Sequence, residues 1–297
     1  MQPEIVSRYS QRLQRDERGV WVAGGGAAVS YPAHGHADCW RIEDGSFWFR
    51  HRNRCILAAI ERHPPRGPVF DVGGGNGFVA AALAGAGREV VLVEPGPQGA
   101  ANASARGLRD VVCATLDDAG FAPGSLPAVG LFDVVEHVRD DGAFLRMVAA
   151  LTAADGLLYV TVPAHRALWS AEDAEAGHFR RYDRPSLQAV VGAAGYETLY
   201  CSYFFRPLVL PIALSRALPY RLGLRRRAAT GQAIAREHGS GGGWAARAMQ
   251  ALLEPEAGHV AAGRTMHHGA SILLVARRRA NVPALAPAPQ PGPGGSR

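Results

Sequence analysis

The sequence contains no lysine, and all 32 of its basic residues are arginine. Without a lysine amine the chain cannot form a Schiff base, anchor pyridoxal phosphate or build a phosphate-binding loop of the Gly-Lys-Ser/Thr type. Arginine exceeds the acidic residues and gives a net charge of +6. Because glycine and proline are also abundant, we attribute the arginine content to a GC-rich genome rather than to a nucleic-acid partner.

Long hydrophobic runs and paired cysteines are missing too. No stretch of about 18 uncharged apolar residues occurs, so we expect no membrane span. The first residues have no apolar core, which predicts that there is no secretory signal. The cysteines Cys39, Cys55, Cys113 and Cys201 are scattered without a CxxC pair. This argues against a disulfide scaffold or a zinc ribbon and favours a reducing cytoplasm.

What is present is an alternation of short apolar segments and helical patterns. Near-continuous apolar strands separated by helices predict an α/β fold, with a parallel sheet covered on both faces. The expected strands are residues 68–72, 89–94, 110–114, 128–135, 156–163, 196–204 and 269–279. The expected helices are residues 47–62, 78–86, 97–107, 141–151, 186–194 and 244–253.

The same alternation sets the expected domain organisation. We expect one domain over residues 46–280, with an insertion at 204–268 between the last two strands. Residues 1–45 are expected to be irregular, because they show no periodicity. Residues 281–297 hold five prolines and are expected to be disordered.

The most specific motif is PVFDVGGGNGF, residues 68–78. It places Asp71 near the end of an apolar strand and Gly73, Gly75 and Gly77 in the turn before a helix. Glycines at such a turn let the backbone bend tightly and approach a ligand closely. The motif therefore predicts a site for a nucleotide-type cofactor.

The spacing of this loop separates two cofactor classes. The nicotinamide pattern GxGxxG fails, because the sixth position counted from Gly73 is Phe78. The S-adenosylmethionine pattern, in which an acid precedes three alternating glycines, is matched fully from Asp71 to Gly77. Glu94 ends the next expected strand and can accept both hydroxyls of a ribose. S-adenosylmethionine is favoured, and nicotinamide and a purely structural turn are the alternatives.

Further segments follow the same pattern: Glu94-Pro95, LFDVVEHV (131–138), ADGLLYVTVP (154–163) and GHFRRY (177–182). Together with DVGGGNG (71–77), they resemble class I S-adenosylmethionine-dependent methyltransferases of the small-molecule type, close to bacterial ubiquinone-pathway O-methyltransferases. The resemblance covers about residues 45–204 and extends to a strand at 270–277. It implies a Rossmann-like, doubly wound sheet of seven strands with the last one antiparallel, and an N-terminal helical cap.

The resemblance also implies which residues contact the cofactor. The stretch after the third strand departs from the family's usual Gly-Asp, and Thr115 and Leu116 are the candidates beside the adenine. An arginine of the 47–62 helix, Arg50 or Arg54, would reach the methionine carboxylate; the alternative is a solvated arginine face. The implied cofactor residues are Arg50, Asp71, Gly73, Gly75, Gly77, Glu94, Pro95, Thr115, Leu116 and Asp133.

Asp133, Glu136 and His137 form a DxxEH motif at the end of the fourth expected strand. The motif resembles the ExxEH of some magnesium-dependent O-methyltransferases, so a Mg²⁺ site completed by His165 or His178 is one alternative. The first position holds an aspartate, which has a shorter reach than the family's glutamate. We favour the other interpretation, in which the two acids shape the cofactor pocket, His137 caps a helix and no metal is bound.

The loop after the fifth expected strand, residues 163–184, is long and rich in titratable side chains. A hydroxyl acceptor has to lose its proton, and imidazole titrates near neutral pH, so His165 and His178 are the candidate general bases. Tyr182 and the two arginines before it are candidates for orienting the acceptor. The alternative is a loop held in place by buried hydrogen bonds of its histidine and tyrosine side chains.

Residues 34–39 (HGHADC) have the spacing of a metal cluster, with His34, His36 and Cys39. No fourth ligand is obvious, so we do not favour a zinc site there.

The segment 204–227 combines leucines with arginines and contains Pro207, Pro211 and Pro219. These prolines are expected to interrupt any long helix. A lid or a core contact is favoured for this segment, and a dimer contact or peripheral binding to a membrane surface is the alternative.

The sequence as a whole predicts a cytoplasmic methyltransferase that acts on a small-molecule acceptor, most readily at oxygen. One alternative is an RNA 2′-O-methyltransferase, but the arginines are spread along the chain and no RNA-binding module is visible. The other is a non-catalytic protein that binds S-adenosylmethionine. The acceptor and the oligomeric state stay open, because function resides in the site and not in the fold.

Overall fold

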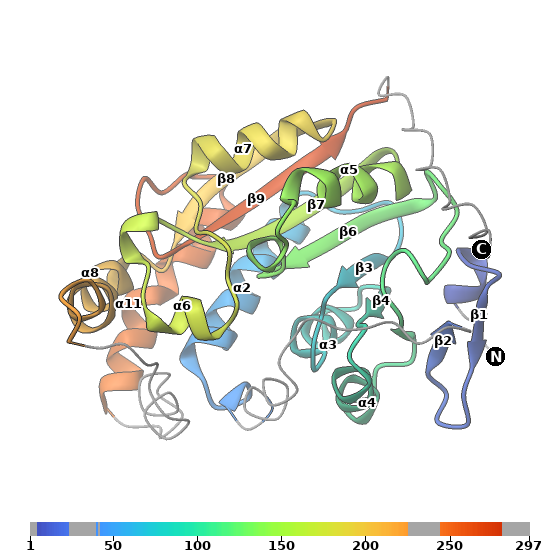
Figure 1. Cartoon of the computed structure of the whole chain (residues 1–297), viewed down its shortest axis with the longest axis horizontal. Coiled ribbons are helices and arrows are strands. Elements are labelled where there is room, and N and C mark those ends of the chain that lie inside the picture. Colours follow the sequence, from blue (N-terminus) through green and yellow to red (C-terminus); the bar gives the residue numbers. More distant parts are fainter. Residues whose placement is uncertain (1–4, 24–39, 41, 225–243, 281–297) are drawn as a thin grey trace, which may run out of the picture.

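The computed structural model describes residues 5–23, 40, 42–224 and 244–280 (Figure 1). A mixed sheet runs through the molecule, with helices on both faces. Its strands are β1 (Leu13–Arg15), β2 (Trp21–Ala23), β3 (Val69–Val72), β4 (Val90–Val93), β5 (Val111–Cys113), β6 (Leu126–Phe132), β7 (Thr152–Pro163), β8 (Tyr196–Phe204) and β9 (Ser271–Arg278).

The helices alternate with these strands. The α-helices are α2 (Phe47–Arg62), α3 (Phe78–Gly85), α4 (Pro97–Ala105), α5 (Asp141–Leu151), α6 (Ala171–Glu175), α7 (Arg184–Ala193), α8 (Val209–Ile212), α9 (Leu218–Arg221) and α11 (Trp244–Ala261). Four 3-10 helices, η1 (Val6–Arg8), η2 (Val135–His137), η3 (Arg166–Leu168) and η4 (Arg206–Leu208), and the π-helix η5 (Ala213–Ala217) complete the described elements.

The strand order is β1-β2-β5-β4-β3-β6-β7-β9-β8. Strands β5, β4, β3, β6 and β7 are parallel, and β9 runs antiparallel to both of its neighbours, β7 and β8. The predicted α/β class and the antiparallel last strand are thereby confirmed. In a parallel sheet of this kind, ligands bind beyond the carboxyl ends of the strands.

The N-terminal segment corrects two expectations. It contributes β1 and β2, so the sheet has nine strands and not seven, and the segment is not wholly irregular. It also packs on the core, where Val6 is fully buried and the Tyr9 ring meets Phe70 edge-on at 5.0 Å. Strands of three residues are too short to show a periodicity. The HGHADC segment and residues 281–297 lie outside the described residues.

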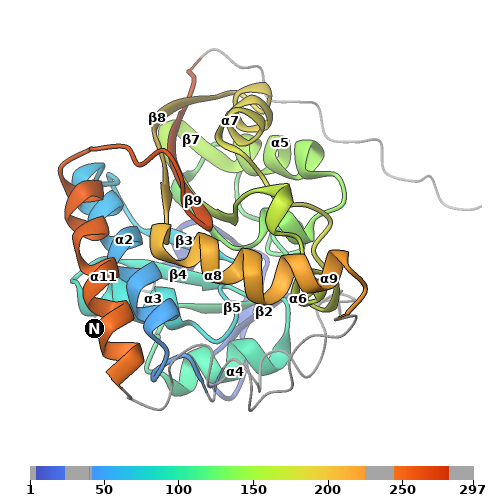
Figure 2. The ribbon, with the colours of Figure 1, turned by 90° about the vertical axis from the view of Figure 1, so that its left-hand side faces the viewer.

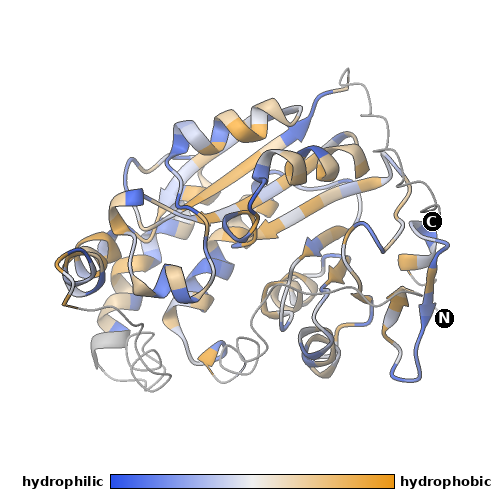
Figure 3. Cartoon of the chain, viewed as in Figure 1, coloured by the Kyte–Doolittle hydropathy of each residue, from blue (hydrophilic) through white to orange (hydrophobic). Residues whose placement is uncertain are grey.

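Two hydrophobic clusters hold the layers together, one on each face of the sheet. One cluster joins the strands to α5 and α7, and the other joins them to α2, α3, α4 and α11. Figure 3 shows the hydrophobic colour along the central strands. Helix α2 begins where the Ser46 hydroxyl accepts a hydrogen bond from the Trp48 amide at 3.2 Å, and it lies beside α11 (Figure 2).

The segment after β8 forms one continuous helical run, η4–α8–η5–α9, over residues 206–221. No α-helical stretch of the run is longer than four residues, which agrees with the expectation that the prolines interrupt a long helix. Pro207 and Pro219 each occupy one of the first two positions of a new helical stretch, where a backbone amide donor is not needed. Glu256 of α11 fixes the start of the run, since its carboxylate accepts hydrogen bonds from the amides of Phe205 (2.7 Å) and Arg206 (2.8 Å).

Candidate cofactor and acceptor site

A cavity of about 570 Å³ opens at the carboxyl ends of the parallel strands. Its volume is in the range of small-molecule sites. Residues that follow β3, β4, β5 and β6 line it on one side, and α6, the loop after it and α8 line it on the other. The residues predicted from sequence that line it are Asp71, Gly73, Gly75, Glu94, Pro95, Thr115, Asp133, Glu136, His137, His178 and Arg181.

The glycine loop turns from β3 into α3 through left-handed backbone conformations. Gly73, Gly75 and Gly77 have φ values of +70°, +55° and +76°, which side chains rarely tolerate. Gly73 and Gly75 line the cavity, whereas Gly77 does not. A Cβ on Gly77 would lie 2.7 Å from Leu108 Cδ1, so this glycine is needed for close packing of the start of α3.

Asp71 lies beneath this loop as a buried carboxylate. Its side chain is 1% exposed, and no hydrogen bond of ordinary geometry reaches either oxygen from the described residues. Burial raises the pKa of Asp71 to about 7; the positive charge of Arg52 opposes this shift, and the negative charge of Glu94 adds to it. A buried carboxylate at the cavity wall fits a cationic ligand, as the ammonium and sulfonium groups of S-adenosylmethionine require.

Glu94 both braces the loop and faces the cavity. Its Oε2 accepts a hydrogen bond from the Gly75 amide at 2.9 Å, and its Oε1 accepts one from the Gly96 amide at 2.7 Å. Each carboxylate oxygen can accept a further hydrogen bond. Glu94 therefore fits the hydroxyls of a ribose while it holds the glycine loop in position.

Arg52, and neither Arg50 nor Arg54, is the α2 arginine that lines the cavity. Arg50 is exposed, and Arg54 pairs with Glu254 on α11. The side chains of Arg50 and Arg54 share one helix face, and Arg52 projects from the opposite one. Arg52 Nη1 lies 2.5 Å from Asp133 Oδ2. The arginine of α2 that reaches the cavity therefore lies two residues from each of the two expected ones.

Asp133 follows β6 in a left-handed conformation, with a φ of 58°. Its Oδ2 pairs with Arg52, and its Oδ1 accepts a hydrogen bond from the Thr161 hydroxyl at 2.9 Å. An aspartate held in this way shapes the cavity wall. Among the described residues, the group whose potential metal-ligand atoms lie close together is Glu136, His137 and His178, and Asp133 is not part of it. Strained residues of this kind are typical of functional sites.

Glu136, His137 and His178 come together in the wall of the cavity. Their potential ligand atoms all lie within 4.8 Å of one another. Burial raises the pKa of Glu136 well above its usual range, and burial, with His178 adding to it, lowers the pKa of His137 to about 4. His137 is therefore uncharged at neutral pH. This donor set could hold a divalent cation, whose binding would favour the ionised form of Glu136.

His178 is held by a buried carboxylate that the sequence analysis missed. Its Nδ1 lies 2.8 Å from Oδ1 of Asp173, which also accepts a hydrogen bond from Arg181 Nε at 2.7 Å. Burial alone would raise the pKa of Asp173, but the contacts with His178 and Arg181 outweigh it and lower the pKa to about 2. Asp173 is thus ionised and fixes the ring of His178, whose Nε2 is left for another partner.

His165, Tyr182 and Leu116 do not line the cavity. The His165 ring stacks on Tyr203 at 4.8 Å, and the buried Tyr182 hydroxyl donates to Asp141 Oδ2 at 2.7 Å. These contacts match the alternative of a latched loop for both residues. Leu116 is buried in the core.

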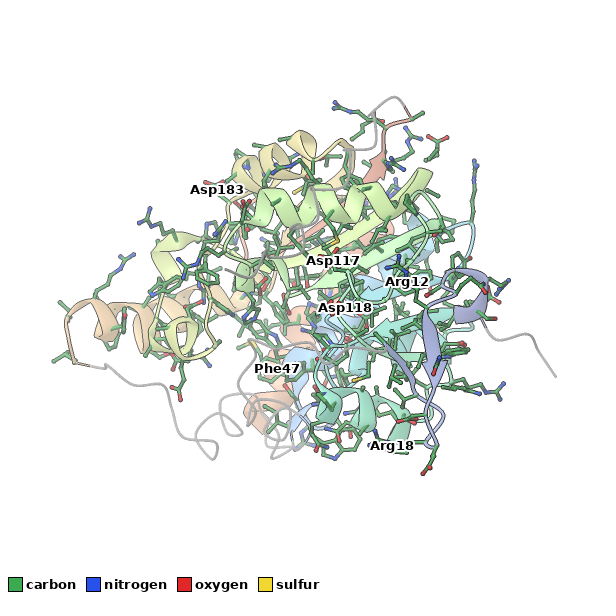
Figure 4. All side chains as sticks on the ribbon, turned by 45° about the vertical axis from the view of Figure 1, so that its right-hand side comes forward. Arg12, Arg18, Phe47, Asp117, Asp118 and Asp183 are labelled. Carbon is green, nitrogen blue, oxygen red and sulfur yellow. The ribbon has the colours of Figure 1, made fainter. Side chains whose placement is uncertain are left out.

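Thr115 does line the cavity, beside Pro95. Its hydroxyl donates to Asp118 Oδ2 at 2.7 Å, in the loop after β5 where Asp117 and Asp118 are labelled in Figure 4. The expected contact of the β5 loop with the cavity therefore rests on Thr115 and not on the side chain of Leu116.

A second network at the cavity rim was also missed. Asn76 donates to Glu43 Oε1 at 3.3 Å, and Glu43 pairs through its other oxygen with Arg106 Nη2 at 2.7 Å. Arg106 Nε in turn donates to the Asn76 carbonyl at 2.9 Å. Three residues from separate elements thus fix the far end of the glycine loop. No local pattern signals them, because Arg106 is 63 residues from Glu43.

Comparison with known proteins agrees with this geometry. Residues 43–200 match the family described as "Methyltransferase domain". A probable S-adenosylmethionine-dependent methyltransferase of Mycobacterium tuberculosis is 26% identical over 166 residues, which are 54% of this chain and 60% of that protein. A ubiquinone biosynthesis O-methyltransferase of Azorhizobium caulinodans is 29% identical over 148 residues, 43% of this chain and 58% of that protein. The chain thus covers less than two thirds of either relative.

The fold has a solved counterpart. One chain of a complex that contains the Haloferax volcanii Trm112 methyltransferase activator superposes with a TM-score of 0.51 at 16% identity, covering 84% of this chain and 98% of that one. The likeness is one of fold alone. The matched family covers more than half of the chain, and the buried acid, the glycine loop and Glu94 fit the cofactor. This chain belongs to the methyltransferase domain family, in the class I S-adenosylmethionine-dependent group.

Proposed function

We propose that this protein transfers the methyl group of S-adenosylmethionine to an oxygen atom of a small-molecule acceptor, with His178 as the general base. One observation carries the proposal: His178 lines the cavity and its Nδ1 is fixed by the buried Asp173. When bound, the cofactor supplies an electrophilic methyl group on a sulfonium. The protein's own contribution is to orient the acceptor and to remove its proton.

The residues on the other side of the cavity would hold the cofactor. Arg52 and Glu94 both line the cavity. Arg52 would meet the methionine carboxylate through a charged hydrogen bond, and Glu94 would accept hydrogen bonds from the ribose hydroxyls. Asp71 would stabilise the positive charges of the ligand from beneath the loop. Pro95 and Thr115, which also line the cavity, would contact the adenine.

Oxygen is the proposed target because His178 can act as a general base beside the acceptor. A hydroxyl must lose its proton as the new bond forms, whereas a neutral amine can attack without prior proton loss. His178 takes that proton at Nε2, and ionised Asp173 stabilises the resulting imidazolium. The ubiquinone O-methyltransferase among the relatives supports the same target.

A panel of paired acceptors tests the proposal. Each pair has the same aromatic or aliphatic skeleton and carries either a hydroxyl or an amine. We expect release of S-adenosylhomocysteine and a mass gain of one methyl group with the hydroxyl member of at least one pair, and little with its amine partner. Preference for the amine across the panel would contradict the assignment to oxygen.

A cation-assisted version of the reaction is the second candidate, because Glu136, His137 and His178 gather their ligand atoms in one place. A divalent cation there would lower the pKa of the acceptor hydroxyl in place of a base. In this version EDTA abolishes turnover, and Mg²⁺ or Mn²⁺ restores it. Turnover that is indifferent to EDTA would leave His178 to act as a base alone.

The pKa of Asp71 predicts how cofactor binding depends on pH. Because burial raises this pKa to about 7, the carboxyl loses its charge as the pH falls below that value. S-adenosylhomocysteine lacks the sulfonium charge but keeps an ammonium group, which needs the ionised form of Asp71. Its affinity should therefore fall by up to about ten-fold per pH unit below pH 7. Calorimetry at several pH values measures this slope. The Asp71→Asn variant should bind more weakly with a flat profile, and a flat profile in the wild type would contradict the role of Asp71.

A further inference from the structure

Exposed leucines line one side of the helical run that follows β8. Leu210, Leu214, Leu218 and Leu222 are 65%, 57%, 47% and 63% exposed, and we call these four residues the leucine ridge. Residues four apart are neighbours on a helix surface, so the side chains form one continuous apolar strip. Contiguous exposed apolar surface of this kind marks an interaction site.

The same part of the sequence carries the protein's excess positive charge. Between Glu197 and Glu237 there are seven arginines and no acidic residue. The rest of the chain, with 25 arginines and 26 acidic residues, is close to neutral. Arg206, Arg216 and Arg221 lie on the described run itself. The leucine ridge therefore lies in a strongly basic part of the sequence.

The run also forms part of the cavity wall. Ile212 and Arg216 line the cavity, while the leucines between and beside them are exposed to solvent. In Figure 1, α8 lies at the outer edge of the molecule, and in Figure 2 the run from α8 to α9 crosses the face toward the viewer. One face of the helix therefore closes the cavity, and another presents the leucine ridge.

We propose that the leucine ridge docks on an anionic membrane surface. The leucines would enter the boundary between headgroups and acyl chains, and the arginines would meet the anionic headgroups. A second copy of the chain fits this surface poorly, because a two-fold contact would bring the arginines of the run toward those of the partner copy. Within the described part of the chain, no helix is long and apolar enough to cross a membrane.

Docking would place the cavity wall at the membrane. If the proposed methyl transfer holds, an acceptor that partitions into the bilayer interface could then enter past Ile212 without crossing bulk water. This consequence rests on the proposed function, whereas the docking itself does not.

Co-sedimentation of the full chain with lipid vesicles tests the docking. We expect binding to vesicles of equal parts phosphatidylglycerol and phosphatidylcholine at low salt, and much weaker binding to phosphatidylcholine alone or at high salt. The double variant Leu210→Asp/Leu214→Asp should lose at least ten-fold in vesicle affinity, since two leucines that enter the membrane surface are replaced by charged residues. Arg206→Gln should lose about five-fold.

Leu252→Asp is the matched control, because Leu252 is 62% exposed on α11 and outside the ridge. It should bind vesicles like the wild type, and every variant should keep its affinity for S-adenosylhomocysteine. Absence of binding to anionic vesicles at low salt would overturn the proposal, as would equal binding by the ridge variant. The proposal would also be overturned if the wild type eluted as a dimer in size-exclusion chromatography and the ridge variant eluted as a monomer. Vesicle binding without methyl transfer would leave docking intact and would count only against the proposed function.

Discussion

Replacing His178 with alanine should lower the turnover of methyl transfer by about 10²- to 10⁴-fold, the usual contribution of a general base. The affinity for S-adenosylhomocysteine should stay close to that of the wild type, because His178 lies on the acceptor side of the cavity. Single-turnover rates with a hydroxyl acceptor, together with calorimetric titration, measure the two quantities separately. The expected result is therefore a loss of rate without a loss of cofactor binding.

His165→Ala is the matched control for this variant. His165 lies in the same loop region but stacks on Tyr203 and does not line the cavity, so its loss should leave the rate near that of the wild type. The turnover of Asp173→Asn should lie between those of His178→Ala and His165→Ala, since Asp173 positions His178. The pH profile of turnover should also shift in this variant. Full turnover in His178→Ala would remove the assignment of the base.

Replacing Arg52 with alanine should weaken S-adenosylhomocysteine binding by about 10- to 100-fold. The loss of a charged hydrogen bond in a partly buried site has about this effect. The substitution also leaves Asp133 without its 2.5 Å ion pair, so an uncompensated carboxylate would remain in the cavity wall. Calorimetric titration of the purified variant measures the affinity, and a thermal melt shows whether the fold is kept.

Arg50→Ala and Arg54→Ala are the controls, because both residues lie on the same helix and neither lines the cavity. Each should bind S-adenosylhomocysteine within about two-fold of the wild type, in line with the small effects of exposed charges. Arg52→Lys should recover only part of the affinity, because lysine keeps the charge but lacks the planar fork of arginine. Equal weakening by all three alanine variants would contradict the assignment to Arg52.

The strands and loops that show a pattern in the local sequence were predictable. Buried parallel strands have apolar runs, and a loop that must approach a ligand needs glycines, so β3 to β9 and the Asp71 loop were found from sequence. The strands β1 and β2 were not found, because three residues are too few to show a pattern and because the pairing of β2 with β5 is long-range.

Side-chain placement in the site depends on rotations and contacts that the sequence does not encode locally. Arg50, Arg52 and Arg54 look alike in sequence, and only the packing of α2 against the sheet and α11 decides which of them enters the cavity. The pairing of Asp173 with His178 could not be predicted either, since it depends on how the loop after α6 folds back. His165, two residues beyond the end of β7, turns instead toward Tyr203.

Calorimetric titration with S-adenosylhomocysteine, with NAD⁺ as the control ligand, tests the central claim most directly. The wild type should bind S-adenosylhomocysteine and not NAD⁺. The Glu94→Ala variant should bind it at least about ten-fold more weakly, because it loses both the ribose contact and the brace to Gly75. Binding of NAD⁺ instead, or no weakening in Glu94→Ala, would contradict the cofactor assignment and the roles of Arg52 and His178 that depend on it.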